Sequence, residues 1–467
     1  MTSSLPTSSH RSWRTTARRR GALLVLGALG VPGSVAAQEL SIGEALRRAE
    51  RSAYPARIAE AQARAREGEA SLALRGMLPS VRLEGGYVRT TDPLGAFGGI
   101  LRQRAVTPEA FEPARLNYPA AIGTFGSALV VEQPIFNADA LFGRRAAQHG
   151  GAAARASEAW QRAGAQLDVV RAYYGAVLAE EQVATLDSAA RAAHAHQRVA
   201  ESRHRNGLAT RSDALLAAVR AGQLDARLIA ARGAATLART RLALALGAPT
   251  DTGLVPTPHL PDTSAIGRLV EDIDSVGAGE REDVRAARLE LAAATAARQR
   301  AAALFLPRVN SFGRLEWSSA GTPFGGREAW TAGLMLSWSP FSGGAELAER
   351  RMAGARSNAA EAAAEAAEAR GRLELQEAVT GLDVALAQMA ITALAVGQSA
   401  EAHRIVGRKY EGGLATAVEL FDAAAEETDA RLGFAQARYE AIVAVAQSRR
   451  ASGRSLGVLA DLDARER

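Results

Sequence analysis

Residues 206–218 read NGLATRSDALLAA, and residues 412–424 read GGLATAVELFDAA. Both stretches contain Gly-Leu-Ala-Thr, an acidic residue three positions after the threonine, and an alanine-rich segment. The glycines that begin the two motifs, Gly207 and Gly413, lie 206 positions apart in a chain of 467 residues. A motif repeated at such a distance indicates that the chain is built from two related halves.

Two further pairs of similar segments support this duplication. LVVEQPIF (129–136) matches LMLSWSPF (334–341), and LPSVRLEGG, which begins at residue 78, matches LPRVNSFGR, which begins at residue 306. The three pairs occur in the same order. We therefore expect a first structural repeat at residues 38–250, a linker or equatorial region at 251–280, and a second structural repeat at 281–467.

Long helices are the strongest structural signal. Residues 137–205 and 345–410 contain no proline, and each stretch extends about 100 Å if it is helical. The chain is 48% hydrophobic but only 5% aromatic, a composition that suits closely packed alanine-rich helices. Shorter helices are expected at 41–77 and 210–246. Together they match one long helix in length, so we expect two short helices stacked beside each long one.

Four segments are predicted to be strands from their alternating polarity, although residues 127–133 alternate poorly because Val130 and Val131 are both apolar, and Phe312 breaks the pattern of another. In one of them, Val81, Leu83 and Tyr87 share one face while Arg82 and Glu84 share the other. The other three lie around residues 127–133, 309–317 and 334–339. Each is about ten residues long, enough for a tilted membrane crossing. Four strands cannot close a spanning barrel, so spanning requires several chains to share one; the alternative is an ordinary half-buried sheet. The proline- and glycine-rich residues 91–123 are expected to be irregular.

The first 37 residues have the order of a secretory signal peptide. Basic residues end at ARRR, an apolar run covers residues 21–31, and SVAA precedes Gln38, so cleavage is expected after Ala37. The formal net charge is +6, of which five charges lie in this acid-free segment. The remainder is close to neutral, which gives no indication of nucleic-acid binding. The chain has no cysteine, which excludes disulfides and thiolate chemistry.

Capping chemistry explains most of the repeated motif. Glycine adopts the left-handed conformation that ends a helix, and threonine or serine caps the next one. Thr210 or Ser212, and Thr416, are therefore expected to cap the returning helices. Asp213 and Glu419 suit the positive first turn. From the residues alone, each motif is a helix-hairpin turn that occurs twice because the chain was duplicated.

In these motifs the chain resembles the TolC family of outer-membrane efflux proteins. The resemblance includes residues 40–87, the strand-to-helix junctions QPIF and SWSPFSGG, and the two Gly-Leu-Ala-Thr turns. It implies a mostly helical fold with a small β part, in which a homotrimer pools four strands per chain into a twelve-stranded barrel above a long helical tunnel. It also implies a passive export duct, for tripartite efflux or type I secretion, that extends from the outer membrane of a Gram-negative-type bacterium into the periplasm. The implied partners are outer-membrane lipid, a periplasmic adaptor and, through the adaptor, an inner-membrane transporter.

The resemblance also implies roles for individual residues near the turns. Glu419 and Asp422 match the acidic rings at the channel constriction, and Asp213 and Tyr410 match residues that hold the tip closed. Ala415 stands where the best-known member has an arginine in that lock, so Arg211 or other residues would have to replace it. The surface that contacts the adaptor would comprise Gly207, Leu208, Ala209, Thr210, Gly413, Leu414, Ala415 and Thr416.

Two other classes of function compete with a duct. An enzyme has little support: the seven histidines form no metal-binding pattern, and no nucleotide-binding motif is present, so we expect no catalytic residue, cofactor or metal. A periplasmic coiled-coil structural or adaptor protein would use the long helices. It would have no use for four alternating strands.

Overall fold

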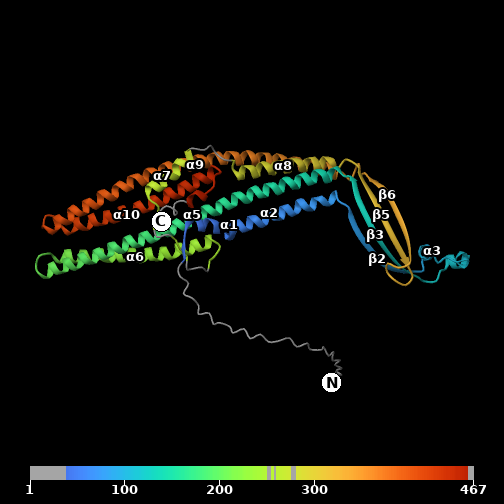
Figure 1. Ribbon diagram of the computed structural model, residues 1–467, viewed down its shortest axis with the longest axis horizontal. Helices are drawn as coiled ribbons and strands as arrows, with labels where there is room; N and C mark the ends of the chain where they lie inside the picture. The colour runs from blue at the N-terminus through green and yellow to red at the C-terminus, as the bar shows by residue number, and fades with distance from the viewer. Residues whose placement is uncertain (1–37, 250–253, 257–258, 275–279, 461–467) are drawn as a thin grey trace, which may run out of the picture.

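The computed structural model describes residues 38–249, 254–256, 259–274 and 280–460. The predicted signal peptide, residues 1–37, lies outside the described residues. The described chain is elongated, with helices along most of its length and a small sheet at one end (Figure 1).

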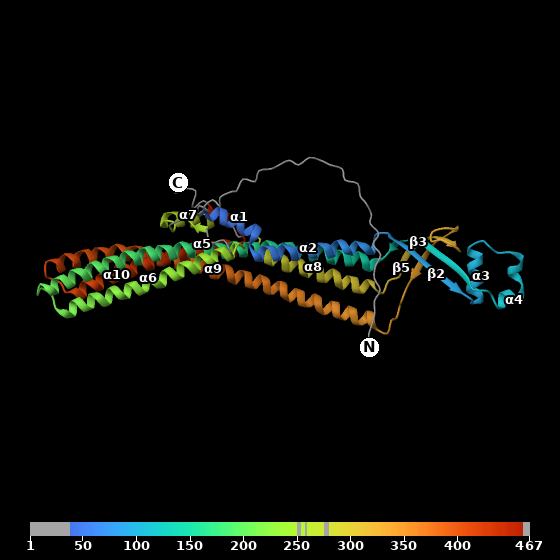
Figure 2. The ribbon, with the colours of Figure 1, turned by 90° about the horizontal axis from the view of Figure 1, so that it is seen from below.

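Two very long helices, α5 (Ala138–Arg205) and α9 (Ala345–Glu411), extend through the helical part. Their 68 and 67 residues correspond to about 100 Å each. Shorter helices pack on them in succession: α2 (Tyr54–Leu72) and α6 (Arg211–Ala245) on α5, and α8 (Glu282–Ala303) and α10 (Ala417–Ala451) on α9. Figures 1 and 2 show one short helix beside each half of a long one, as the sequence predicted.

The helix predicted at residues 41–77 is interrupted rather than continuous. It consists of α1 (Ile42–Ser52), α2 and a short 3-10 turn, η1 (Ala73–Gly76). Ala53, with φ −58° and ψ 132°, separates α1 from α2, and Pro55 lies in the first turn of α2. Proline has no amide hydrogen to donate and disfavours a helical conformation just before it, so a new helix begins at this point.

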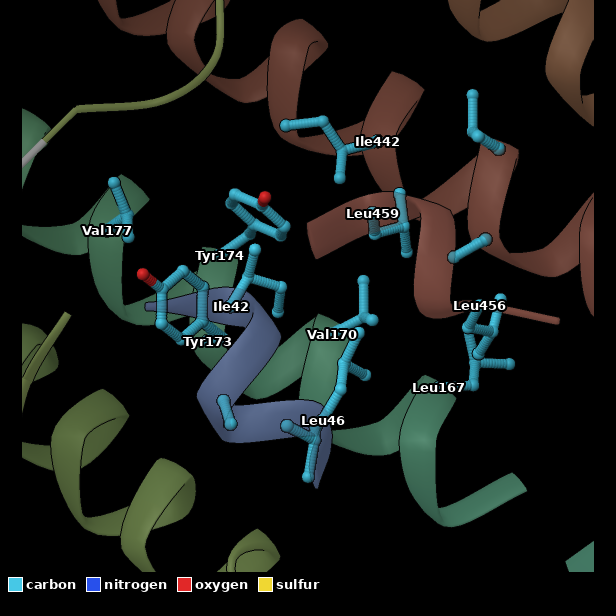
Figure 3. Packing of buried hydrophobic residues seen from close by; sticks show 14 of the residues in the cluster. Ile42, Leu46, Leu167, Val170, Tyr173, Tyr174, Val177, Ile442, Leu456 and Leu459 are labelled. Atoms are coloured by element: carbon cyan, nitrogen blue, oxygen red, sulfur yellow. The ribbon is translucent and has the colours of Figure 1, made fainter. Parts of the chain in front are cut away.

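The large buried side chains gather in the middle of the molecule. Here α1 packs between α5, α10 and the C-terminal turn η3 (Gly457–Ala460), as Figure 3 shows for Ile42, Tyr173 and Leu459. The fully buried Tyr173 donates its hydroxyl to the carbonyl of Leu40 at 2.7 Å. Alanine dominates the buried positions elsewhere along the helices, which lets them lie close together. The molecule therefore has a well-packed middle from which the hairpins and the sheet project in opposite directions.

The predicted linker contains structure of its own. Strand β4 (Leu254–Pro256) pairs in parallel with β1 (Gln38–Leu40), and α7 (Thr263–Asp274) packs against α10. The start of the first repeat is thus tied to the segment between the repeats. These contacts add to the packed middle of the molecule.

The sheet contains four antiparallel strands in the order β2-β3-β5-β6. Their bounds are β2 (Ser80–Thr90), β3 (Ile122–Phe136), β5 (Arg308–Ser319) and β6 (Arg327–Ser337). All four lie where the alternation predicted strands. Strands β2 and β6 are the two edges of the sheet, so each has one side without a partner strand in the single chain.

The two faces of the sheet differ sharply in chemistry. The register places Leu83, Leu129, Leu315 and Trp330 in one row across the strands, on an apolar face. The opposite face carries an ionic network. Arg314 contacts Glu84 at 3.0 Å and Glu316 at 2.5 Å, and Arg82 contacts Glu132 at 2.7 Å. This division suits a wall between lipid and a polar bore.

The connection between β2 and β3 is more regular than predicted. It contains α3 (Pro93–Arg102), a 3-10 turn η2 (Pro108–Phe111) and α4 (Pro113–Asn117). Each of these begins with a proline, and Asp92 caps α3 by accepting a hydrogen bond from the amide of Gly95 at 2.7 Å. Proline is favourable in the first turn of a helix, where its missing donor has no partner to lose. The expectation of an irregular segment was wrong because these prolines start helices rather than break them.

Candidate functional site: two hairpin tips and the groove between them

The two Gly-Leu-Ala-Thr motifs form the ends of two helical hairpins. The first hairpin consists of α5 and α6, and the second consists of α9 and α10. The backbones of the two turns are nearly identical. Gly207 has φ +72° and Gly413 has φ +75°, a conformation that glycine adopts without steric cost. The amide of Leu208 donates to the carbonyl of Arg203, and that of Leu414 to the carbonyl of Lys409, both at 2.8 Å. Each glycine therefore ends a long helix in the predicted manner.

The helix that follows each turn begins with a reciprocal cap. Thr210 accepts from the amide of Asp213 at 3.2 Å, and the Asp213 carboxylate accepts from the amide of Thr210 at 3.1 Å. Thr416 and Glu419 make the same two bonds at 3.3 and 2.7 Å. The predicted caps are confirmed, and each acidic residue of the motif contributes to its cap as well as to the helix dipole.

The tips present apolar side chains to solvent. Leu208 is 78% exposed and Leu414 is 83% exposed, and they occupy equivalent places in the two turns. Ala209 and Ala415 are half-buried beside them, while the flanking glycines and threonines are exposed. The residues predicted to contact an adaptor thus form two small exposed surfaces at the end of the molecule (Figure 1).

The predicted lock residues have local partners within the single chain. The Asp213 carboxylate is bonded to the amide and hydroxyl of Thr210, as part of the cap. Tyr410 packs beside a small buried cluster that includes Phe421, and the guanidinium of Arg203 lies 4.8 Å from the centre of its ring. The role of these residues between neighbouring hairpins stays a prediction.

The predicted constriction residues both lie in the first turns of α10, but they have different surroundings. Glu419 is exposed, and hydrogen bonds from the backbone and side chain of Thr416 lower the pKa of its carboxyl. Asp422, also exposed, forms an ion pair with Arg220 of α6 at 3.2 Å. Glu419 therefore remains charged well below neutral pH, whereas Asp422 links the second hairpin to the first.

Sequence reasoning missed a ladder of ion pairs between the two hairpins. Arg220 pairs with Asp422, and one heptad further Arg227 pairs with Asp429 at 2.7 Å. Helices α6 and α10 run in the same direction, and both pairs join residues 202 positions apart. The sequence signal was a spacing of seven residues in both helices. It places Arg220 and Arg227 on one face of α6, and Asp422 and Asp429 on one face of α10.

A groove of about 270 Å³ lies between the hairpins just above the tips. Its lining includes His196 of α5, Arg220 and Arg227 of α6, His403 of α9, and Phe421, Glu427 and Arg431 of α10. Burial, and secondarily the neighbouring His403, lower the pKa of His196. His403 bonds to Glu427 at 2.5 Å. Within the described parts of the chain, no group of three histidine or acidic side chains is arranged to hold a metal ion.

Comparison with known proteins connects this geometry to a family. The sequence profile described as outer membrane efflux protein matches residues 56–248 and 278–454, which is most of the chain. No curated protein sequence matches.

Several solved structures share the fold. The outer membrane protein VceC of Vibrio cholerae is 20% identical, with a TM-score of 0.73 over 89% of this chain and 96% of that one. The CmeC outer membrane channel of Campylobacter jejuni is 14% identical, with a TM-score of 0.72 over 88% and 85%. The open-state MtrE outer membrane channel of Neisseria gonorrhoeae is 18% identical, with a TM-score of 0.69 over 89% of both chains.

Proposed function

Because the chain belongs to the outer membrane efflux protein family, whose members are ducts in the outer membrane, we propose that three copies of it form one export channel that docks to a periplasmic adaptor. The chain itself is an outer-membrane duct for efflux. The proposal concerns how copies assemble, what they contact, and which residues line the narrowest point.

The single observation that carries the trimer is the open sheet. A spanning sheet cannot leave edges in lipid, because unpaired backbone groups cost several kcal/mol each there. Strands β2 and β6 are such edges, and one face of the sheet is apolar while the other is ionic. Pairing β6 of one copy with β2 of the next closes twelve strands into a barrel with the apolar face toward lipid.

The helical part supports the same assembly. Helix α9 contains a stretch that is apolar enough, by length and composition alone, to cross a membrane, and most of it is exposed in the single chain. Leu373, Val384, Ile391 and Leu394 are each more than half exposed along this helix. A second copy that packs on α9 would cover this surface and continue the barrel as a helical tunnel.

The tips are the proposed site for the adaptor. Leu208 and Leu414 are exposed on two equivalent turns, so a trimer would present six such turns in a ring. Small apolar residues at a hairpin end suit contact with the hairpin end of another protein. Through this adaptor the duct would connect to an inner-membrane transporter, for tripartite efflux or type I secretion.

Above the tips, Glu419 and Asp422 would form the charged constriction, and Asp213 and Tyr410 would hold the tip closed. Three-fold symmetry turns each acidic residue into a ring of three carboxylates, which favours cations. The proposed arrangement of the chain is a repeat at 38–250, a linker at 251–280 and a repeat at 281–467.

Adaptor docking is tested with Leu414→Asp, which places a charge at the apolar tip. We expect loss of chemical cross-linking to a periplasmic adaptor, while the trimer retains its heat-modified mobility on gels. Leu414→Met, which preserves the apolar surface, is the matched control. Cross-linking that persists in Leu414→Asp would rule out docking at this turn.

The constriction is tested with Glu419→Ala/Asp422→Ala in planar bilayers. We expect higher single-channel conductance and weaker blockade by multivalent cations, with Glu426→Ala, another exposed acid of α10, as the control. Unchanged conductance and blockade would place the constriction elsewhere. A periplasmic coiled-coil protein, the competing function, would fail to float with outer-membrane vesicles.

A further inference from the structure

The connection between β2 and β3, residues 91–121, is called the outer insert below. It is held firmly at the end of the sheet farthest from the helices (Figures 1 and 2). Gln103 donates from its Nε2 to Thr124 Oγ1 at 2.9 Å and to the carbonyl of Gly123 at 3.1 Å. Arg104 reaches the carbonyl of Glu328 at the start of β6 at 3.3 Å. The insert is therefore bonded to two different strands and has a defined position.

The insert lies on the ionic face of the sheet. A cavity of about 460 Å³ separates α3 from that face, lined by Leu94 and Gly98 of α3 and by Glu84, Arg314 and Glu316 of the ionic network. Helix α3 makes its closest approach at Gly99, where an added Cβ would lie 2.7 Å from Thr124 Oγ1. Since the ionic face lines the bore in the proposed trimer, the insert projects into the bore.

Helix α3 has three sides with different surroundings. Gly95 and Gly99 lie toward the sheet, and Ala96, Phe97 and Ile100 pack within the insert, where the Phe97 ring lies 5.7 Å from that of Phe111. The third side carries Leu94, Gly98 and Leu101, at positions i, i+4 and i+7 of one helix stripe, and Leu94 and Gly98 also border the cavity over the ionic face. Leu94 is 85% exposed and Leu101 is 57% exposed, and an added Cβ at Gly98 would meet no atom within 4 Å. We call these three residues the α3 stripe.

The dimensions of the bore determine what can cover this stripe. Twelve strands spaced about 4.8 Å apart and tilted by about 40° close into a backbone cylinder roughly 24 Å across. Three helices of about 10–12 Å diameter, in mutual contact, occupy a circle of roughly 22–26 Å. Figures 1 and 2 place α3 at the outer ends of the strands, and a circle of that size fills the whole cylinder, so three α3 helices at the outer mouth of one barrel would have no room to stay apart.

We infer that the α3 stripe is an interaction surface for two further copies of this chain, and that three outer inserts pack against one another across the outer end of the bore. This inference rests on the proposed trimer. Leucines on both sides of a glycine allow three helices to approach closely and bury apolar surface that one chain leaves in water. The packed inserts form an apolar constriction at the end of the channel opposite the acidic tip. Outgoing cargo must push the three inserts apart to leave the channel.

Cross-linking through single cysteines tests the contact, because the natural chain has no cysteine. Leu94→Cys and Leu101→Cys are treated, in purified trimers, with a bis-maleimide that spans only adjacent side chains. One cysteine per chain can join only two of three copies, so covalent dimers of up to about two thirds of the chains are expected. Leu83→Cys is the matched control: it is 65% exposed on the apolar face, where copies lie about 20 Å or more apart.

Each outcome decides the inference. Dimers from the stripe positions but not from Leu83→Cys support it, and Gly98→Cys replaces either leucine variant that does not assemble. Normal trimers without cross-links at the stripe overturn it and leave the proposed channel intact. Equal cross-linking at Leu83 would reveal collisions between separate channels and would also overturn it. A wild-type chain that forms no trimer would instead overturn the proposed function.

Discussion

The two helical hairpins end in the same kind of turn, but the contacts between their two helices differ. Their turns share the positive-φ glycine, the exposed leucine and the reciprocal cap. Along the first hairpin, α5 and α6 are joined at heptad intervals by two ion pairs, Glu180–Arg239 and Asp187–Arg232, and by a hydrogen bond between His194 and Asp225. In the described tip half of the second hairpin, α9 and α10 have one comparable pair, His403–Glu427.

This difference indicates which hairpin is held by its own contacts and which depends on its neighbour. The first hairpin is joined along its length. The second is joined to the first through Arg220–Asp422 and Arg227–Asp429, beside the groove that contains His196 and His403, and through the more buried Arg438–Glu181 pair between α10 and α5. The second hairpin is therefore the one expected to move when the tip opens. The following predictions test this asymmetry, from the largest expected effect to the smallest.

Arg220→Ala/Arg227→Ala removes both ion pairs between α6 and α10, while the Arg438–Glu181 pair between α10 and α5 remains. An exposed ion pair contributes about 0.2–1 kcal/mol, so losing two should shift the equilibrium between the closed and the open tip toward the open one by roughly two- to thirtyfold. Single-channel recording in planar bilayers would measure this as higher open probability.

The matched control for that prediction is Arg232→Ala/Arg239→Ala, which removes the same number of arginines from the same helix. These arginines pair within the first hairpin, so the tip should stay closed. If the control opened the channel as much as the test variant, the asymmetry between the hairpins would have no functional meaning.

Removing one cap should affect either hairpin equally. Thr210→Val and Thr416→Val each remove a capping hydroxyl, at a cost of about 1 kcal/mol, so amide hydrogen exchange in the first turn of α6 or α10 should become about fivefold faster. Thr428→Val, which loses only a bond to the carbonyl of Ala424 within α10, should change exchange far less. A response at only one tip would show that the similar geometry conceals different stability.

Acidification should loosen the groove between the hairpins. The pKa of His196 is lowered from its usual 6.5, so packing around neutral His196 is fully stable above about pH 6.5 and weakens as pH falls through the lowered value. A protonated His196 would face three arginines across the groove, Arg220, Arg227 and Arg431, each of which is paired with an acidic residue. It would also face His403, which bonds to Glu427.

We expect open probability to rise between pH 7.5 and pH 5.5, because opening frees His196 from the burial that lowers its pKa and so favours its protonated form. His196→Phe should abolish this rise, whereas His194→Gln, which alters a pair inside the first hairpin, should preserve it. A rise that survives in His196→Phe would assign the pH response to other groups.

Much of the fold was predictable because the decisive signals are local. Proline-free stretches predicted α5 and α9, and alternating polarity predicted the four strands. Glycine followed by threonine predicted the two capped turns. Pro55 and the prolines of residues 93–113 were harder to interpret, since the same residue ends one helix and begins the next. The candidate site was only partly predictable. The two turns and their threonine caps were foreseen, but Asp213 and Glu419 also bond back to their caps, and Asp422 has an unforeseen arginine partner. The constriction, lock and docking roles stay predictions.

The sequence by itself determined the duplicated plan, the long helices, the strands and the hairpin ends, because propensity, periodicity and capping act between residues close together in the chain. Only the tertiary structure decided which hairpin supports the other and where the outer insert lies. Those features depend on contacts between residues such as Arg220 and Asp422, or Gly99 and Thr124, whose side chains meet only after helices and strands have packed in a particular register.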